Sequence, residues 1–246
     1  MAESYAVALL AMLLAGGVAG LTGFGFALVS SPLLLLVFDP PTVVAVMLVL
    51  SLLINSAIAL DSWRQVRVRP VLSLLPWALA GLLLGAEVLQ VLGAGQIRLL
   101  AGVTVVVFAL LMIWGVEIPG LGSRWGTAAA GGASGALSTS TGLAGPPVVM
   151  LFAARGFPKE SFRASNAAYF LCISLAGLAL FFLRDLLSAS HLYLAAALLP
   201  AVLLGKTAGT RLLLRVSDEL FRRITLALVL VAGLAAVASG LYALVP

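Results

Sequence analysis

Six apolar stretches, each about as long as a helix that crosses a bilayer, constrain this chain more than any other feature. Such a helix needs about 20 predominantly apolar residues. The stretches are residues 42–60, 71–92, 97–114, 162–183, 192–213 and 224–244. Only 9% of the 246 residues are charged and 63% are hydrophobic, so polar side chains are too few to cover a water-facing surface. The sequence therefore predicts an all-α integral membrane protein.

The scarcity of reactive side chains narrows the function classes. Cys172 is the only cysteine and His191 the only histidine, which leaves no disulfide framework and no pattern of metal ligands. The net charge of +5 comes from basic residues spaced between apolar runs, whereas a nucleic-acid-binding surface would gather them in one patch. An intramembrane enzyme would need a nucleophile with its base, or a metal cluster, within the spans. We therefore expect no enzyme activity, no nucleic-acid partner, no metal and no cofactor.

Two further apolar segments do not fit a simple helix. Residues 5–38 contain AGGVAGLTGFGF, and residues 125–154 contain AGGASGALSTSTGLAGPP. Each is too short for two full spans and is interrupted by glycine, small polar residues or proline. Irregular backbone survives at membrane depth only where protein covers it or where it lines a water-filled cavity. The sequence predicts that these segments are re-entrant hairpins or discontinuous helices.

An internal repeat relates the two broken segments and the helices that follow them. An offset of 115 residues places Gly16, Gly17, Gly20 and Pro32 on Gly131, Gly132, Gly135 and Pro147, and an offset of 124 places Pro76, Gly81, Gly85 and Arg98 on Pro200, Gly205, Gly209 and Arg222. The alternative is chance, because glycine-rich apolar sequences align with themselves easily. We interpret residues 1–118 and 119–246 as two repeats, each a broken hairpin plus three transmembrane helices.

The distribution of basic residues predicts how the repeats are oriented, because Lys and Arg collect on the cytoplasmic side. If each broken segment enters and leaves on one side, the basic loops 64–69, 155–163 and 211–223 share one face with Arg124. The opposite face then keeps only Arg98 and Arg184. If each broken segment crosses once, the basic residues are divided far more evenly. The first arrangement is favoured, and it predicts inverted repeats with both termini outside.

Inverted repeats with interrupted helices are typical of secondary transporters, which hold their substrate near the bilayer midplane. A half-helix that begins inside the membrane presents unpaired N–H groups and a partial positive charge, which suit an anion. The sequence therefore predicts a transporter of small anions that works by alternating access.

At these motifs the sequence resembles the TauE/SafE (TSUP) family of sulfite and organosulfonate permeases. The matching pieces are GLTGFGFALVSSPLL at 20–34, TSTGLAGPPVVMLF at 139–152, GFPKESFRASN at 156–166, GLLLGAEVL at 81–89 and GKTAGTRLL at 205–213. The resemblance implies movement of sulfite, organosulfonates or other small organic anions across the bacterial inner membrane, driven by a proton or ion gradient. Many members carry a glycine-dense stretch where this chain has Ser138-Thr139-Ser140-Thr141-Gly142, so hydroxyls replace bare backbone here.

The two tips of the broken segments are the first candidates for substrate binding. They consist of Thr22, Gly23, Phe24 and Gly25 in the first repeat and Ser138, Thr139, Ser140, Thr141 and Gly142 in the second. Glycine exposes backbone N–H donors, and the hydroxyls are donors for an oxyanion. The alternatives are helix packing through small residues, as expected for Gly16 and Gly20, and hydrogen bonds from the hydroxyls to carbonyls of their own helix.

Four polar residues within the spans are further candidates. Asn55 and Asn166 would either line the substrate path or hydrogen-bond between helices. Lys206 would either bind the anion or reach the cytoplasmic interface. Glu87 would either relay a proton that couples transport or form an ion pair with an arginine on another helix.

The predicted function is therefore ion- or proton-coupled transport of sulfite or an organosulfonate by a multi-pass protein of the bacterial inner membrane. An anion channel, and a carrier of other small organic anions such as carboxylates, are the alternatives. The predicted partners are the small anionic substrate and the lipid bilayer. Small residues such as Gly102, if they face lipid, would allow a homodimer.

Overall fold

In the computed structural model, which describes residues 2–22, 25–115, 118–213 and 218–244, the described residues form helices and no strand. The helices are α1 (Ala2–Thr22), α2 (Phe26–Leu34), α3 (Pro40–Ser62), α4 (Val68–Val91), α5 (Ala94–Trp114), α6 (Arg124–Thr141), α7 (Gly145–Ala154), α8 (Lys159–Leu183), α9 (Ala189–Leu213) and α10 (Asp218–Tyr242), with a short 3₁₀ turn, η1 (Trp63–Gln65). The predicted all-helical class is confirmed.

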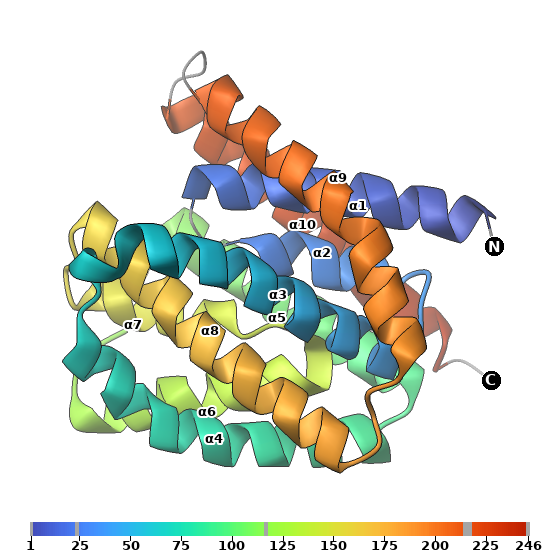
Figure 1. Ribbon diagram of the computed structural model, residues 1–246, viewed down its shortest axis with the longest axis horizontal. Coiled ribbons are helices and arrows are strands. Elements are labelled where there is room, and N and C mark those ends of the chain that lie inside the picture. Colours follow the sequence, from blue (N-terminus) through green and yellow to red (C-terminus); the bar gives the residue numbers. More distant parts are fainter. Residues whose placement is uncertain (1, 23–24, 116–117, 214–217, 245–246) are drawn as a thin grey trace.

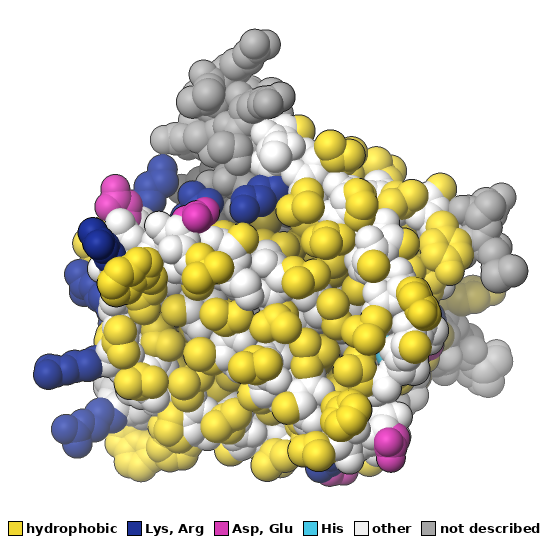
Figure 2. All heavy atoms as spheres, in the orientation of Figure 1, with side chains coloured by type: hydrophobic (Ala, Val, Ile, Leu, Met, Phe, Trp, Pro, Cys, Tyr) yellow, Lys and Arg dark blue, Asp and Glu magenta, His cyan; other side chains and the backbone are white. Residues whose placement is uncertain are grey.

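Five segments of the described chain are long and apolar enough to span a membrane: Pro40–Gln65, Val68–Val91, Ala94–Trp114, Lys159–Leu183 and Ala189–Ala208. The sixth predicted stretch forms α10. Figure 2 shows hydrophobic side chains covering the broad face of the bundle, while Lys and Arg gather along one edge. This arrangement is the reverse of a soluble protein and matches a surface in contact with lipid.

Local sequence signals explain where several helices begin. The Asp39 side chain accepts a hydrogen bond from the Thr42 N–H at 3.1 Å, and Pro40 supplies the first residue of α3. Ser123 caps α6 in the same way, because its hydroxyl accepts from the Gly126 N–H at 3.1 Å. These caps satisfy N–H groups that have no partner within the helix.

Each broken segment folds as a long helix followed by a half-length one. The first consists of α1 with 21 residues and α2 with 9, and the second of α6 with 18 and α7 with 10. The half-helices α2 and α7 are too short to cross a bilayer, since they rise only about 14–15 Å. The prediction of discontinuous helices in these two segments is confirmed.

Helices from different halves of the chain pack against one another in matching pairs. Helix α1 lies along α9, and α4 lies along α6, as Figure 1 shows. Helix α3 contacts α8, and α5 contacts α10. This is the pattern that two equivalent halves would produce, because α1 and α4 correspond in order to α6 and α9. The inversion of the two repeats across the membrane stays a prediction.

Glycines bring the paired helices into backbone contact. A Cβ at Gly16 or Gly205 would fall on a carbonyl of the partner helix, and the same holds for Gly81 and Gly135. The atoms in the way are the Val202 and Leu13 carbonyls between α1 and α9, and the Gly132 and Ala78 carbonyls between α4 and α6. Small residues allow this approach in membrane helices. The packing role expected for Gly16 is thus confirmed, whereas the side of α1 at Gly20 lies outside the described residues.

Gly102 was expected to face lipid, and this expectation is wrong. Gly102 is buried against α10, where a Cβ would stand 2.6 Å from the Val237 nitrogen and 2.8 Å from the Gly233 oxygen. It therefore joins α5 to α10 within the chain and offers no surface to a second copy. The homodimer itself stays a prediction.

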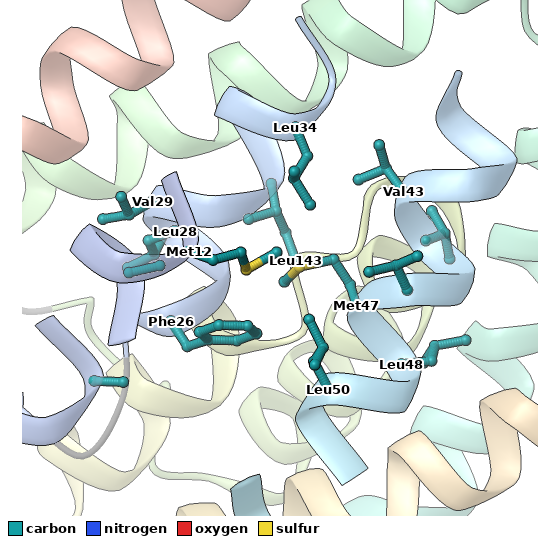
Figure 3. Packing of buried hydrophobic residues seen from close by; sticks show 14 of the residues in the cluster. Met12, Phe26, Leu28, Val29, Leu34, Val43, Met47, Leu48, Leu50 and Leu143 are labelled. Carbon is teal, nitrogen blue, oxygen red and sulfur yellow. The ribbon is translucent and has the colours of Figure 1, made fainter. Parts of the chain in front are cut away.

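The hydrophobic core surrounds the breaks in the two broken segments. Buried side chains from α1, α2 and α3 meet Leu143, which lies between α6 and α7. Figure 3 shows Met12 and Met47 extending toward each other beside Leu143, with Phe26 close by. Protein thus covers Leu143 at the second break and Phe26 beside the first, as a low-dielectric membrane requires.

These contacts predict the effect of adding one methyl group at a helix crossing. We expect Gly135→Ala to lower stability by about 1–3 kcal/mol, because its Cβ would collide with backbone of α4. Gly132→Ala on the same helix is the control, since its Cβ would lie 3.9 Å from the nearest atom, the Trp77 oxygen. The thermal unfolding midpoint (Tm) of the purified protein measures both. Equal Tm values for the two variants would contradict the packing described here.

Candidate functional site

The two breaks meet around a partly open cavity with a volume of about 60 Å³. Helices α3 and α8, which cross beside the breaks, complete its wall. The polar and small residues that line it are Gly25, Ser51, Asn55, Ser138, Gly142, Gly145 and Ser174, together with Ala19, Ala27, Ala144 and larger apolar side chains such as Phe26 and Phe170. The cavity is several times larger than the 10–15 Å³ or so that one water molecule needs.

The first break supplies backbone donors. Gly25 has a φ of 92°, a left-handed conformation that glycine adopts readily, and it immediately precedes α2. The Val29 N–H bonds back to the Gly25 carbonyl at 3.3 Å, so the N–H groups of residues 26–28 have no partner within the helix. Residues 26–28 all line the cavity. The positive end of the α2 dipole is therefore directed at this space.

The second break is built differently. Gly142 ends α6 with a φ of 78°, and its N–H donates to the Ser138 carbonyl at 3.1 Å. Helix α7 begins at Gly145, and Pro146 and Pro147 follow. Proline has no N–H, so the start of α7 offers fewer backbone donors than the start of α2. The two breaks thus contribute unequally to binding an anion.

Hydrogen bonds from side chains satisfy two carbonyl groups at the second break. The Tyr169 hydroxyl donates to Ser134 at 2.9 Å, and the Ser134 hydroxyl donates to the Ala144 carbonyl at 2.5 Å. The Ser31 hydroxyl donates to the Thr141 carbonyl at 2.5 Å and so joins α2 to the end of α6. Sequence reasoning missed these three residues. For two of them the sequence held a signal, because Ser31 and Ser134 each lie within eleven residues of a glycine at a break.

The four hydroxyl groups of the second tip have different roles. Ser138 is 3% exposed and lines the cavity. Thr139 donates to the Leu82 carbonyl of α4 at 2.7 Å, whereas Ser140 and Thr141 donate to carbonyls of α6 itself at 2.7 and 2.8 Å. The break comes after Thr141, so this run is the last helical turn of α6. The geometry therefore brings Ser138 and Gly142 to the cavity, while the other three hydroxyls bond to backbone.

Helices α3 and α8 also contribute hydroxyls to the cavity lining. Asn55 donates to the carbonyl and the hydroxyl oxygen of Ser51, at 2.8 and 3.0 Å. Because the Ser51 oxygen accepts a hydrogen bond, its own proton stays available as a donor. Ser174 on α8 is 3% exposed and also lines the cavity. In the sequence, only its spacing of eight residues from Asn166 would have indicated Ser174.

The remaining predicted residues lie outside the cavity lining that the described residues form. Asn166 is fully buried on α8, one helical turn before Phe170. Lys206 is half-buried on α9 and has contacts of its own. Glu87 is 58% exposed and forms an ion pair with Arg184 at 2.5 Å, which joins α4 to the end of α8.

For the first tip, the structure describes Gly25 and the backbone of Thr22, which ends α1. Gly23, Phe24 and the side chain of Thr22 lie outside the described residues. Among the described residues, no charged side chain lines the cavity, and no group of acidic, histidine or cysteine residues is placed to hold a metal ion. The donors described for the cavity are neutral hydroxyls and backbone N–H groups.

Comparison with known proteins places the chain. The model of the family described as "Sulfite exporter TauE/SafE" matches residues 8–236. No curated protein and no solved structure matches significantly. The match includes both breaks and, at least in part, each α-helix that the described residues form. The chain therefore belongs to the sulfite exporter TauE/SafE family, which implies a multi-pass membrane transporter of sulfite or a related sulfur compound.

Proposed function

We propose that this protein is a carrier that binds sulfite, or a similarly small sulfur oxyanion, in the cavity between the two breaks. The observation that carries the proposal is the set of donors around that cavity. Three N–H groups of α2 and the hydroxyls of Ser51, Ser138 and Ser174 converge on a space at the breaks, where a membrane protein otherwise avoids exposed polar groups. Oxygen atoms of an anion accept from such donors.

The cavity volume favours a small ion. About 60 Å³ is well below the 300–1,000 Å³ or so of a pocket for a drug-sized ligand. Sulfite has only four heavy atoms, while organosulfonates add a carbon chain. We therefore propose sulfite as the first substrate to test, with organosulfonates and small carboxylates as competitors.

The way the cavity is walled supports our proposal of alternating access. Its two breaks belong to opposite halves, and Ser31 of α2 holds the end of α6 through the Thr141 carbonyl. A movement of one half against the other would open the cavity to one side and close it to the other. Coupling through Glu87 would act from outside the cavity, through the ion pair with Arg184.

The basic edge of the molecule, where Lys and Arg gather, supports one orientation of the protein in the membrane. The connections from α3 to α4 and from α7 to α8, together with the first turns of α4 and α8, carry Arg64, Arg67, Arg69, Arg155 and Lys159. The first turn of α1 and the last turn of α10 lie on the other side of the bundle in Figure 1. By the preference of basic residues for the cytoplasm, we propose a bacterial inner-membrane protein with both termini outside.

The proposed function predicts saturable flux in a transport assay. Proteoliposomes that contain the wild-type protein should take up radiolabelled sulfite with saturation, and an imposed proton gradient should change the rate. Preloading with unlabelled sulfite should accelerate uptake by exchange, because a carrier returns faster when it is loaded. Protein-free liposomes are the control. Flux without saturation or exchange would indicate a channel, and no flux from folded protein would remove sulfite as the substrate.

Two serines on one helix test the site. We expect Ser138→Ala to raise the half-saturating sulfite concentration at least about tenfold, the usual effect of losing a hydrogen bond to a charged ligand. Ser140→Ala should stay near wild type, because that hydroxyl bonds to the Ala136 carbonyl of its own helix. Both variants are compared in the proteoliposome assay at equal amounts of folded protein. Equal effects of the two substitutions would contradict the assignment of Ser138 to the site.

A further inference from the structure

A buried amide near the cavity has no hydrogen-bond partner among the described residues. Asn166 is 0% exposed, and neither its Nδ2 nor its Oδ1 bonds to any protein group among the described residues. Buried polar groups in native proteins are nearly always paired, and each exception calls for an explanation. The amide of Asn166 is therefore free, with respect to the described residues, to bind a small ligand.

Asn166 shares a helix face with two residues of the cavity wall. Phe170 and Ser174 follow it on α8 at intervals of four residues, so the three side chains project in similar directions. Asn166 stands about 6 Å along the axis from Phe170 and about 12 Å from Ser174. It thus lies just beyond the cavity, on the side toward the start of α8.

The start of α8 belongs to the basic edge of the molecule. The Ser165 hydroxyl accepts a hydrogen bond from the Arg67 N–H at 3.0 Å, which fixes this turn of α8 against the loop before α4. The Arg67 guanidinium lies over the Phe157 ring, 4.7 Å from its centroid. Asn166 is therefore located between the central cavity and a loop that carries arginines, which attract anions.

Phe170 lies on α8 between Asn166 and Ser174. It lines the cavity, and its ring tip lies 3.9 Å from where a Cβ of Gly145 would stand, at the start of α7. Its ring also makes an edge contact with Tyr169, with centroids 5.6 Å apart. The ring therefore reaches from α8 to the second break, at the part of the cavity wall that is nearest to Asn166 along α8.

We propose that Asn166 is a second binding station for the transported anion, on the route between the cavity and the basic edge, and that Phe170 is the gate between the two stations. This proposal rests on the proposed function. In the conformation described, the gate is closed and the amide has no partner among the residues that the structure describes. When the Phe170 ring moves, the anion passes to Asn166, whose N–H groups bind an anion oxygen.

The first test combines stability with transport for Asn166→Leu, which replaces the amide with an apolar group of similar size. Removing an unpaired buried amide should leave the Tm unchanged or raise it. Loss of the station should lower the sulfite transport rate about tenfold, the effect of one hydrogen bond to a charged ligand. Wild-type transport, or a lower Tm together with a lower yield of folded protein, would overturn the proposal.

Ser165→Ala is the matched control, because Ser165 is the neighbouring residue, equally buried, and has a partner. It should lower the Tm, since the Arg67 N–H loses its acceptor, and should leave transport by the folded protein near wild type. A merely structural role for Asn166 would give the same result in both variants.

The second test does not depend on the identity of the substrate. Cys172 is the only cysteine, so Cys172→Ala provides a cysteine-free background in which Asn166→Cys is labelled with a methanethiosulfonate that carries a sulfonate group. Adding Phe170→Ala should speed labelling about tenfold or more if the ring blocks the route. An unchanged rate would overturn the gate. If wild-type protein carries no sulfite, the proposed function fails, and this labelling decides the route by itself.

Discussion

The polar backbone at the two breaks has to be satisfied inside the bilayer, and much of the structure depends on this requirement. Lipid offers no hydrogen bonds, so each exposed carbonyl or N–H needs a protein partner or a cavity. The Ala144 and Thr141 carbonyls accept hydrogen bonds from Ser134 and Ser31, and Tyr169 donates to the Ser134 hydroxyl, while the N–H groups of α2 open onto the cavity. Carbonyls that would repel an anion are thus bonded, and donors that attract one are left available.

Close packing between the halves makes this enclosure feasible. The glycines of α1, α4, α6 and α9 allow backbone contact in two crossings, α1 with α9 and α4 with α6. Helices α3 and α8 pack against these pairs and against each other. Their contact brings Ser51 and Ser174 to the same cavity. The repeated glycines in the sequence are therefore mainly structural, and their effect on the site is to hold its walls together.

Much of the fold could be predicted from the sequence, because apolar length and glycine breaks act locally. All six apolar stretches became helices, and both interrupted segments became a long helix followed by a half-helix. The site was harder to predict, because a hydroxyl has the same appearance in the sequence whichever way it points. Thr139 and Ser140 bond to backbone while Ser138 lines the cavity, and this division depends on the rotation of α6 against α4. The contact of Gly102 with α10 was not predicted for a similar reason, since periodicity does not reveal which apolar face of a helix meets protein.

A site of neutral donors suits a carrier better than one with a fixed positive charge. An arginine or lysine buried beside the anion would bind it strongly in a low dielectric and slow its release. Hydroxyls and helix N–H groups bind more weakly, and binding for transport has to be strong enough to capture and weak enough to release. The arginines of the basic edge can still concentrate anions without holding them, because water screens these side chains. The basic edge therefore attracts the anion and the cavity binds it weakly. Asn166 lies between these two regions.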